Sequence, residues 1–199
     1  MKITSIKQQV KNPERVSVFV DDKYSFSLSL NELLAQKIKK DDELDQADVK
    51  RFKKISADGK IKARALEWVL GRPRSLREFG DYLYRKQAEP ELIEKLRVEF
   101  QKKGYLDDAK FALWLIEMRQ RGGRSDRAIR AELYKKGVGR EVVEETMAGD
   151  DNEMQRLKEL IAKKQKLPRY QKDPEKLKQY LVRQGFSWQD VKQALTEGA

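Results

Sequence analysis

The chain has 199 residues, of which 44 are Lys or Arg and 33 are Asp or Glu, which leaves a formal net charge of +11. This basic excess favours a polyanionic partner, although many of the charges lie at i,i+4 spacing and are equally typical of a solvated helical surface. Cysteine and histidine are absent, so disulfides, thiolate nucleophiles, thiolate zinc sites and histidine-dependent triads are excluded. Enzymes that use only carboxylates, lysine or tyrosine stay open.

The N-terminal segment gives no sign of a targeting or membrane-spanning sequence. Residues 1–9 contain no apolar stretch of the kind found in signal peptides. No apolar run in the chain approaches the ~18 residues that a membrane span requires. We therefore expect a soluble, cytoplasmic protein that has no membrane partner.

The first 30 residues alternate between apolar and polar side chains. Residues 16–20 and 24–28 place apolar side chains at every second position, on either side of a short polar turn. This period-two pattern predicts a β-hairpin, and residues 3–10 are expected to add a third strand. Because so small a sheet is marginal alone, we expect it to pack on a helix. Ser29 and Glu32 form a predicted capping box for one such helix.

From about residue 45 the chain is predicted to be helical to its end. Ser75 with Glu78 forms a second capping box, Pro90 occupies a first helical position, and Gly104 and Gly137 are predicted helix stops. Similar signals delimit the remaining helices. The predicted helices are residues 58–71, 75–87, 90–103, 107–121, 125–136, 140–148, 151–166, 174–184 and 188–197.

The helical region repeats a unit of about 50 residues. Residues 74–86 recur as residues 124–136 at a shift of 50 positions, with Arg, Ser, Leu, Tyr and Lys at identical places. A weaker third copy follows 48 residues later, around Gly185. The preceding helices align at a shift of 46, where Trp68 matches Trp114. Tandem units of this length predict modules that bury their apolar faces partly against their neighbours.

We therefore predict a mainly α protein of three tandem three-helix repeats, helix-turn-helix-like, in an elongated array that follows a small N-terminal β-hairpin region. A row of like modules suits a polymer with repeating sites better than a compact ligand. The predicted domains are the N-terminal β-hairpin and helix region, residues 1–55, and the three repeats, residues 56–105, 106–149 and 150–199.

The turn at residues 104–108, Gly-Tyr-Leu-Asp-Asp, has two interpretations. In the structural one, Gly104 ends a helix in a left-handed conformation, and Asp107 and Asp108 cap and charge the start of the next helix. The functional one is the metal site of a nuclease, but adjacent carboxylates point in different directions and no further ligand set is legible. We favour the structural role and expect no catalytic residue, metal or cofactor. A phosphate-binding glycine loop is also absent, so nucleotide hydrolysis is not expected.

Basic residues near both ends of the second helix in the first two repeats are the candidate partner-binding residues. Arginine binds phosphate and carboxylate groups through paired donors, and Arg124, Arg127 and Arg130 step by three along a helix flank to form a predicted basic ridge. The alternative is structural, because arginine stems cover apolar surface and lysines complement a helix C-terminus. The candidates are Arg72, Arg74, Arg77, Arg85, Lys86, Arg119, Arg121, Arg124, Arg127, Arg130, Lys135 and Lys136.

The aromatic residues lie mostly at apolar helical positions. Trp68, Trp114 and Trp188 are therefore predicted to lie in the core rather than to stack on nucleic-acid bases. Tyr84 and Tyr134 each follow a leucine that is predicted to be buried, so a surface role for these two residues stays open.

Residues 103–112, Lys-Gly-Tyr-Leu-Asp-Asp-Ala-Lys-Phe-Ala, resemble the hallmark of the RecX family of bacterial recombination regulators. The setting is similar too, with Arg-Pro-Arg-Ser at residues 72–75 upstream, and Glu-Leu and Lys-Gly pairs at residues 132–133 and 136–137 downstream. The resemblance covers roughly residues 60–195 and is loose in the third repeat, which has no copy of the Gly-Tyr-Leu-Asp-Asp string. The first 50 or so residues are expected to lie outside it.

This resemblance implies a non-enzymatic regulator of homologous recombination, DNA repair and the SOS response. Members of the family bind the RecA–single-stranded DNA filament in its helical groove and hinder its extension, ATP hydrolysis and strand exchange. We therefore expect a monomer whose partners are the RecA filament and single-stranded DNA, with double-stranded DNA left open. The alternative from another class is a sequence-tolerant DNA-binding protein built of helix-turn-helix-like modules.

Overall fold

The computed structural model describes residues 1–149 and 152–197, and the chain divides into two compact units. Unit 1 consists of Met1–Gly71 and Tyr82–Leu96, and unit 2 consists of Arg72–Asp81 and Arg97–Ala199. The described residues form eleven helices and three strands, which confirms a mainly α fold with a small N-terminal sheet. Within them, no helix is both long enough and apolar enough to cross a membrane.

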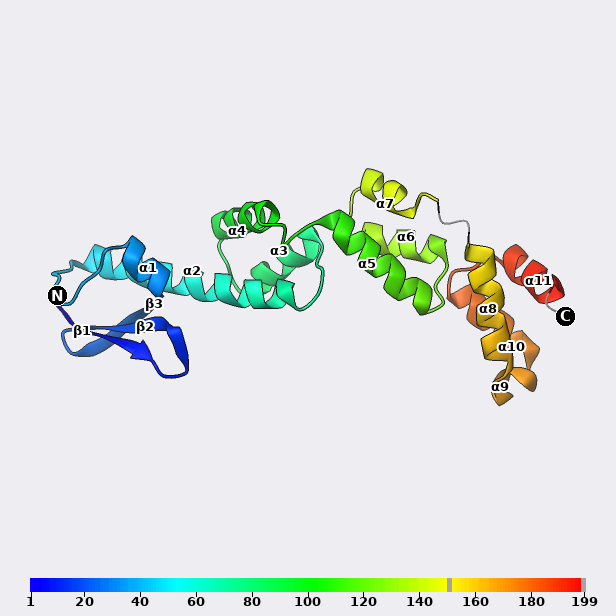
Figure 1. Ribbon diagram of the computed structural model, residues 1–199, viewed down its shortest axis with the longest axis horizontal. Coiled ribbons are helices and arrows are strands. Elements are labelled where there is room, and N and C mark those ends of the chain that lie inside the picture. Colours follow the sequence, from blue (N-terminus) through cyan, green and yellow to red (C-terminus); the bar gives the residue numbers. More distant parts are fainter. Residues whose placement is uncertain (150–151, 198–199) are drawn as a thin grey trace. The chain divides into compact units, whose positions relative to one another are not determined.

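Unit 1 begins with a three-stranded antiparallel sheet (Figure 1). The strands, in their order across the sheet, are β1 (Ile3–Gln9), β2 (Asn12–Val20) and β3 (Lys23–Ser29). Asp21 and Asp22, with φ angles of 47° and 62°, make the tight turn between β2 and β3. Val18 pairs with Phe26 across the hairpin, and both side chains are buried. The predicted hairpin and third strand are therefore confirmed.

The helix that follows the sheet starts at the predicted capping box. In α1 (Leu30–Ala35), the Ser29 hydroxyl accepts a hydrogen bond from the Glu32 backbone N–H, and the Glu32 carboxylate accepts one from the Ser29 backbone N–H. The cap therefore ends β3 and begins the helix within one residue.

The next helix, α2 (Gln46–Leu70), is the support that the small sheet requires. It packs on β3, and its Phe52 side chain joins the apolar core of the sheet. The helix starts at residue 46 rather than at the predicted residue 58, because Asp45 and Asp48 form a capping box that the sequence analysis did not identify. The longer helix links the sheet to the repeat region within unit 1.

The rest of the chain consists of shorter helices, eight of which lie within two residues of their predicted bounds. The added one is the single-turn helix α9. Residue 151, the predicted start of the helix that contains α8, lies outside the described residues. The helices are α3 (Leu76–Arg85), α4 (Pro90–Lys102), α5 (Asp108–Arg121), α6 (Asp126–Lys135), α7 (Arg140–Met147), α8 (Glu153–Gln165), α9 (Pro168–Gln171), α10 (Pro174–Arg183) and α11 (Trp188–Glu197).

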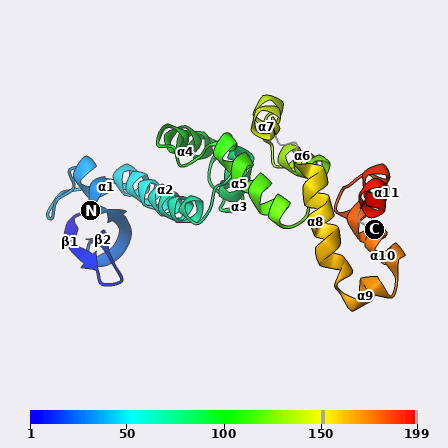
Figure 2. The same ribbon diagram turned by 45° about the vertical axis from the view of Figure 1, so that its right-hand side comes forward.

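Unit 2 contains two apolar cores built on the same pattern. One joins α5, α6 and α7, and the other joins α8, α10 and α11 (Figure 2). Leu133 of α6 and Leu181 of α10 occupy equivalent repeat positions, and both side chains are fully buried. Val138 and Phe186, which follow the glycines after α6 and α10, also correspond and are also buried. The repeat in the sequence is therefore a repeat of buried positions.

Candidate functional site

The predicted arginine turn of the first repeat lies in a set of contacts within unit 2. Ser75 is fully buried, and its hydroxyl donates to the backbone carbonyl of Lys136 at the end of α6 (2.8 Å) and accepts from the Glu78 backbone N–H. The backbone N–H of Leu76 donates to the Asp108 carboxylate at the start of α5 (2.9 Å). These contacts between residues 72–78 and residues 108–137 are called joint 1.

At joint 1, Glu78 binds two of the candidate cations. Its carboxylate accepts hydrogen bonds from both terminal nitrogens of Arg72 (3.1 and 3.2 Å) and from Lys136 Nζ (2.7 Å). Burial raises the pKa of the Glu78 carboxyl, but the hydrogen bonds from Arg72 and Lys136 outweigh burial and hold the pKa below its usual value. The Arg72 guanidinium also lies over the indole of Trp114, 4.8 Å from the ring centre. Arg72 and Lys136 are therefore held by contacts within the chain.

The same kind of joint recurs 50 residues later at the start of α6. The backbone N–H of Ser125 donates to the Gln184 carbonyl (3.1 Å), and that of Asp126 donates to the Glu153 carboxylate (2.8 Å). The Asp126 carboxylate is buried and accepts a hydrogen bond from Arg156 (2.6 Å). These contacts between residues 122–128 and residues 153–185 are called joint 2.

Two of the three arginines of the predicted ridge belong to joint 2. Arg124 donates to the carbonyl of Arg183 (3.2 Å), and Arg127 donates to the carbonyl of Gly185 (3.1 Å). Arg130 lies instead 3.8 Å from Glu144 of α7. The ridge is therefore divided between two neighbours, and a structural role accounts for the contacts of its first two members. Partner binding by these arginines stays a prediction.

Two glycines mark the points where the joints close. Gly137 and Gly185 have φ angles of 81° and 104°. A Cβ on Gly137 would lie 2.8 Å from the Arg77 Cβ, and one on Gly185 would lie 2.4 Å from the Ser125 hydroxyl. Both positions therefore need glycine for the backbone angle and for the close approach. The equivalent residue of the first repeat is Gln87, at a φ of 58°.

Other candidate cations form ion pairs near the joints. Arg119 donates twice to the Glu132 carboxylate, at 2.7 Å each, and these hydrogen bonds hold the pKa of Glu132 below its usual value. Arg121 pairs with Glu117 of the same helix. Burial and the neighbouring Arg72 charge lower the pKa of Arg74. These three arginines lie at the predicted turns. Arg119 and Arg121 pair with acidic side chains, and Arg74 is partly buried.

The remaining candidates lie at helix ends and are exposed. Arg85 ends α3 and Lys86 directly follows it, while Lys135 ends α6. The Lys86 ammonium lies 5.6 Å from the ring centre of Tyr82, which itself stacks on Trp68 at 4.3 Å. Arg77, Arg121, Arg124 and Arg127 are exposed as well, so exposure alone does not distinguish these three basic side chains from the other candidates.

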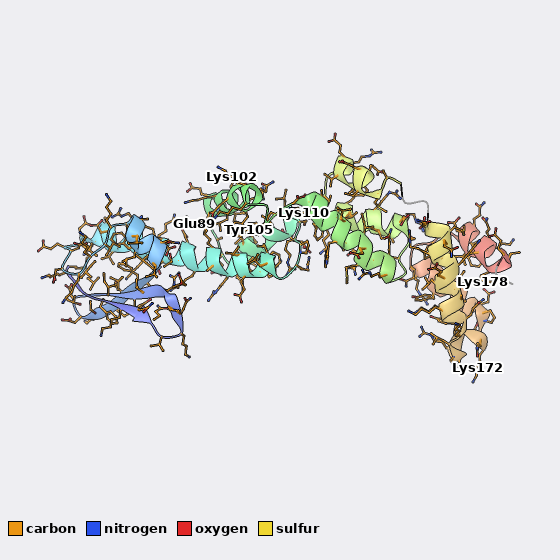
Figure 3. The ribbon with its side chains drawn as sticks, viewed as in Figure 1. Glu89, Lys102, Tyr105, Lys110, Lys172 and Lys178 are labelled. Atoms are coloured by element: carbon orange, nitrogen blue, oxygen red, sulfur yellow. The ribbon has the colours of Figure 1, made fainter. Side chains whose placement is uncertain are left out.

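The Gly-Tyr-Leu-Asp-Asp turn has the structure that capping predicts. Gly104 has a φ of 70° and ends α4, while the Asp107 carboxylate accepts from the backbone N–H groups of Ala109 and Lys110 (2.9 and 3.1 Å). Asp108 serves joint 1, and burial raises the pKa of its carboxyl. The predicted cap at Asp107 is therefore confirmed, and Asp108 lies in the first turn of α5 as predicted, but its carboxylate binds the start of α3 rather than capping its own helix. Figure 3 shows Lys102, Tyr105 and Lys110 around this turn.

The prediction that all three tryptophans lie in the core is wrong for Trp188. Trp68 and Trp114 are half-buried, whereas the Trp188 side chain is 55% exposed. Trp188 is the first residue of α11, and the buried face of that helix is supplied by Val191 and Ala194. An apolar residue type alone does not distinguish these positions, because burial depends on where the neighbouring helix α10 lies.

The two tyrosines whose role was open are on the surface. Tyr84 is 77% exposed and Tyr134 is 41% exposed. The Tyr134 hydroxyl donates to Glu144 of α7 at 2.8 Å, and this hydrogen bond raises the pKa of the phenol. Each tyrosine follows a fully buried leucine, as the sequence pattern indicated.

Residues 152–197 combine cations with aromatic rings in a way that the sequence analysis did not identify. They carry eleven basic and six acidic side chains, a net charge of +5. Arg169 lies over Tyr170 (4.4 Å), Lys164 over Tyr180 (5.1 Å) and Lys178 over Trp188 (5.9 Å). Figure 3 labels Lys172 and Lys178 in this region. The lysine density after residue 152 was the signal that could have identified it.

The chain matches two family models, the regulatory protein RecX N-terminal domain over residues 1–45 and the second three-helix domain of RecX over residues 107–147. The first match corrects the expectation that the N-terminal residues lie outside the resemblance. The regulatory protein RecX of Bacillus pumilus is 31% identical over 98% of this chain and 76% of its own length. The regulatory protein RecX of Listeria monocytogenes is 30% identical over 99% of this chain and 76% of its own length.

Solved structures show the same fold. A crystal structure of a regulatory protein RecX superposes with a TM-score of 0.70 at 22% identity, over 96% of this chain and 98% of that one. The RecX structure from Lactobacillus salivarius superposes with a TM-score of 0.58 at 20% identity, over 71% of this chain and 96% of that one. At these identities the superpositions establish the arrangement of helices and strands.

Proposed function

Because this chain belongs to the RecX family of regulatory proteins, we propose that it inhibits the RecA recombinase by binding RecA–single-stranded DNA filaments. The observation that carries this proposal, beyond family membership, is the recurrence of one joint at equivalent positions of successive repeats. Similar modules that are connected in the same way suit a partner whose own binding sites repeat, and a helical filament is such a partner.

In the proposed mechanism the protein contacts successive filament subunits and needs no catalytic group of its own. Bridging would block the addition of the next RecA subunit, or the subunit motions that accompany ATP turnover, and so slow filament extension and strand exchange. We place the protein in the cytoplasm, as a monomer. Its net charge of +11 would favour the polyanionic surface of a nucleoprotein filament.

Among the candidate residues, Arg85, Lys86 and Lys135 are the first contacts to test. They are exposed and lie outside the contacts described for joints 1 and 2, whereas Arg72, Arg124, Arg127 and Lys136 form the hydrogen bonds of those joints. A substitution in the second group would change the joints as well as any partner contact. Substitutions at Arg85, Lys86 and Lys135 avoid this ambiguity.

The test of the proposal is a titration of the protein into a RecA ATPase assay on single-stranded DNA, beside a binding titration on the same DNA without RecA. We expect inhibition at concentrations well below those that coat bare DNA. Inhibition that appears only once bare DNA is saturated would contradict filament binding and would support competition for DNA.

A matched pair of variants sharpens this assay. Arg85→Gln with Lys86→Gln removes two exposed charges at the end of α3, and Lys39→Gln with Lys40→Gln removes two exposed charges in the N-terminal region. The first variant should need more protein for half-inhibition than the second. Equal shifts would indicate that only the overall charge matters.

The second candidate function is sequence-tolerant DNA binding by helix-turn-helix-like modules. The +11 net charge and the cation-rich residues 152–197 favour it. It predicts tight binding to bare DNA with a steep salt dependence, and no inhibition of RecA beyond what DNA occupancy explains. The two titrations above separate the candidates.

A further inference from the structure

The indole of Trp188 is exposed although neither the core nor the helix cap needs it. Its side chain is 55% exposed at the first position of α11. The cap of that helix is made by the Ser187 hydroxyl, which accepts from the Asp190 backbone N–H (3.0 Å). The core contacts come from Val191 and Ala194. Leaving an indole exposed forfeits a large hydrophobic gain, so this side chain is available to a ligand.

The neighbours of Trp188 combine cations with apolar surface. Lys178 of α10 places its ammonium 5.9 Å from the indole ring centre and also pairs with Glu175 at 2.6 Å. Val182, one helical turn after Lys178, is 39% exposed and lies on the same flank of α10. Lys192, one turn after Trp188 on α11, is exposed. Lys178 therefore borders the aromatic ring, Lys192 lies one turn away on the same helix, and Val182 lies on the flank of α10 that carries Lys178.

A shallow hollow also lies on α11, and its lining includes Lys192, one helical turn after Trp188. It has a volume of about 350 Å³, and Lys192 and the amides of Gln189 and Gln193 are hydrogen-bond donors in its lining. The lining also contains the Glu197 carboxylate, which is bound by Lys158 and Gln193. Gln189 directly follows Trp188 in the helix. Donors beside an exposed ring suit a ligand that has both a flat aromatic part and anionic or acceptor groups.

This arrangement belongs to the third repeat alone. The positions equivalent to Trp188 are Pro90 and Arg140, the first residues of α4 and α7. The surrounding residues 152–197 hold +5 of the net charge of +11 in less than a quarter of the chain. A flat aromatic ligand with a negative backbone therefore has a candidate site at the start of α11, a position where the other repeats carry no aromatic ring.

We propose that Trp188 stacks on a base of single-stranded DNA while Lys178 and Lys192 contact its phosphates. Proteins that bind single strands without sequence preference use this combination of aromatic rings and cations along the backbone. The inference rests on the proposed function and deepens it, because it assigns the α10–α11 surface to the DNA of the filament rather than to RecA.

The test compares a labelled oligothymidylate with an abasic oligonucleotide of the same length, by fluorescence anisotropy. Trp188→Ala should weaken binding of the oligothymidylate about tenfold, as loss of one base stack does, and leave binding of the abasic strand unchanged. Trp188→Phe should retain most of the affinity. Tyr24→Ala, at a tyrosine that is also 55% exposed but lies in the sheet, is the matched control and should change neither affinity.

Lys192→Gln tests the phosphate contact separately. It should weaken binding of both oligonucleotides and reduce the slope of log affinity against log salt by about one. Circular dichroism of each variant checks that α11 is folded. An unchanged salt slope would contradict the contact at Lys192.

The outcomes distinguish this inference from the proposed function. Equal weakening of both oligonucleotides in Trp188→Ala, or no weakening of either, overturns base stacking. Unchanged DNA binding combined with weaker inhibition of RecA would also overturn it, and would assign the surface to the recombinase while the proposed function stands. If the wild-type protein fails to inhibit RecA, the proposed function fails, and the oligonucleotide measurements still decide the stacking.

Discussion

Joints 1 and 2 connect equivalent backbone positions with different side chains. In both, a fully buried serine begins a helix and faces the end of another helix at a glycine with positive φ. Joint 1 adds Glu78 with its two cations and the Arg72–Trp114 contact. Joint 2 instead has the Asp126–Arg156 pair and carbonyl acceptors for its arginines.

The difference shows which part of a joint tolerates sequence change. The backbone of each glycine lies so close to side-chain atoms of the facing segment, those of Arg77 in joint 1 and of Ser125 and Ala128 in joint 2, that a Cβ has no room, so the glycine recurs in both joints. Each joint also holds a half-buried charge that must be neutralised, and more than one combination of acidic and basic residues can do this. We therefore expect the glycines to carry larger stability effects than the ion pairs.

The largest effect is expected at a joint glycine. Gly185→Ala forces a Cβ to within 2.4 Å of the Ser125 hydroxyl at a φ of 104°. Left-handed strain of about 1–2 kcal/mol and overpacking of about 1–3 kcal/mol should add, so urea unfolding should show a loss of about 3 kcal/mol. Gly104→Ala is the control, since its φ is 70° but the nearest atom that its Cβ would meet, Lys110 Nζ, is 3.9 Å away. Equal losses in the two variants would contradict a role for close approach.

A smaller loss is expected from the buried ion pair of joint 2. Asp126→Asn removes the charged acceptor of Arg156 and should lower the free energy of unfolding by about 2 kcal/mol. Glu117→Gln, which removes the partner of the exposed Arg121, should cost under about 0.5 kcal/mol. Denaturant titrations of both variants measure the difference, and similar losses would show that burial at joint 2 adds nothing.

Joint 1 should be sensitive to acid. The pKa of Glu78 is lowered in the folded protein, so its contribution is present above the unfolded pKa of about 4.3 and is lost as the pH falls through the lower folded value. Glu78→Gln should therefore lower stability at pH 7 by about 1 kcal/mol and flatten the decline below pH 4. Thermal unfolding as a function of pH measures this, and an unchanged acid decline in the variant would exclude Glu78 as its source.

The smallest effect is expected beside the joints, at the half-buried pair of Arg119 and Glu132. Arg119→Lys keeps the charge and loses the two parallel hydrogen bonds, so a loss of about 0.5 kcal/mol is expected. Chemical denaturation with an Arg119→Gln comparison measures it. A full loss in Arg119→Gln but none in Arg119→Lys would show that charge, rather than paired geometry, is sufficient.

The sequence by itself determined the helices, their caps and the repeat. A capping box or a helix stop involves residues within about four positions of one another, so Ser29 with Glu32 and the stop at Gly104 are legible from local spacing. Periodic apolar positions likewise predicted the buried Leu133 and Leu181. The start of α2 at residue 46 was missed even though its signal, Asp45 with Asp48, is equally local.

Only the tertiary structure decided what the polar and aromatic surface residues contact. Ser75 meets Lys136 across 61 positions, and Arg124 meets Arg183 across 59, so no local pattern identifies these partners. The same applies to Trp188, whose exposure depends on the position of α10 rather than on its own helix. Residue type limits which contacts a side chain can make, but the packing of helices distant in sequence selects among them.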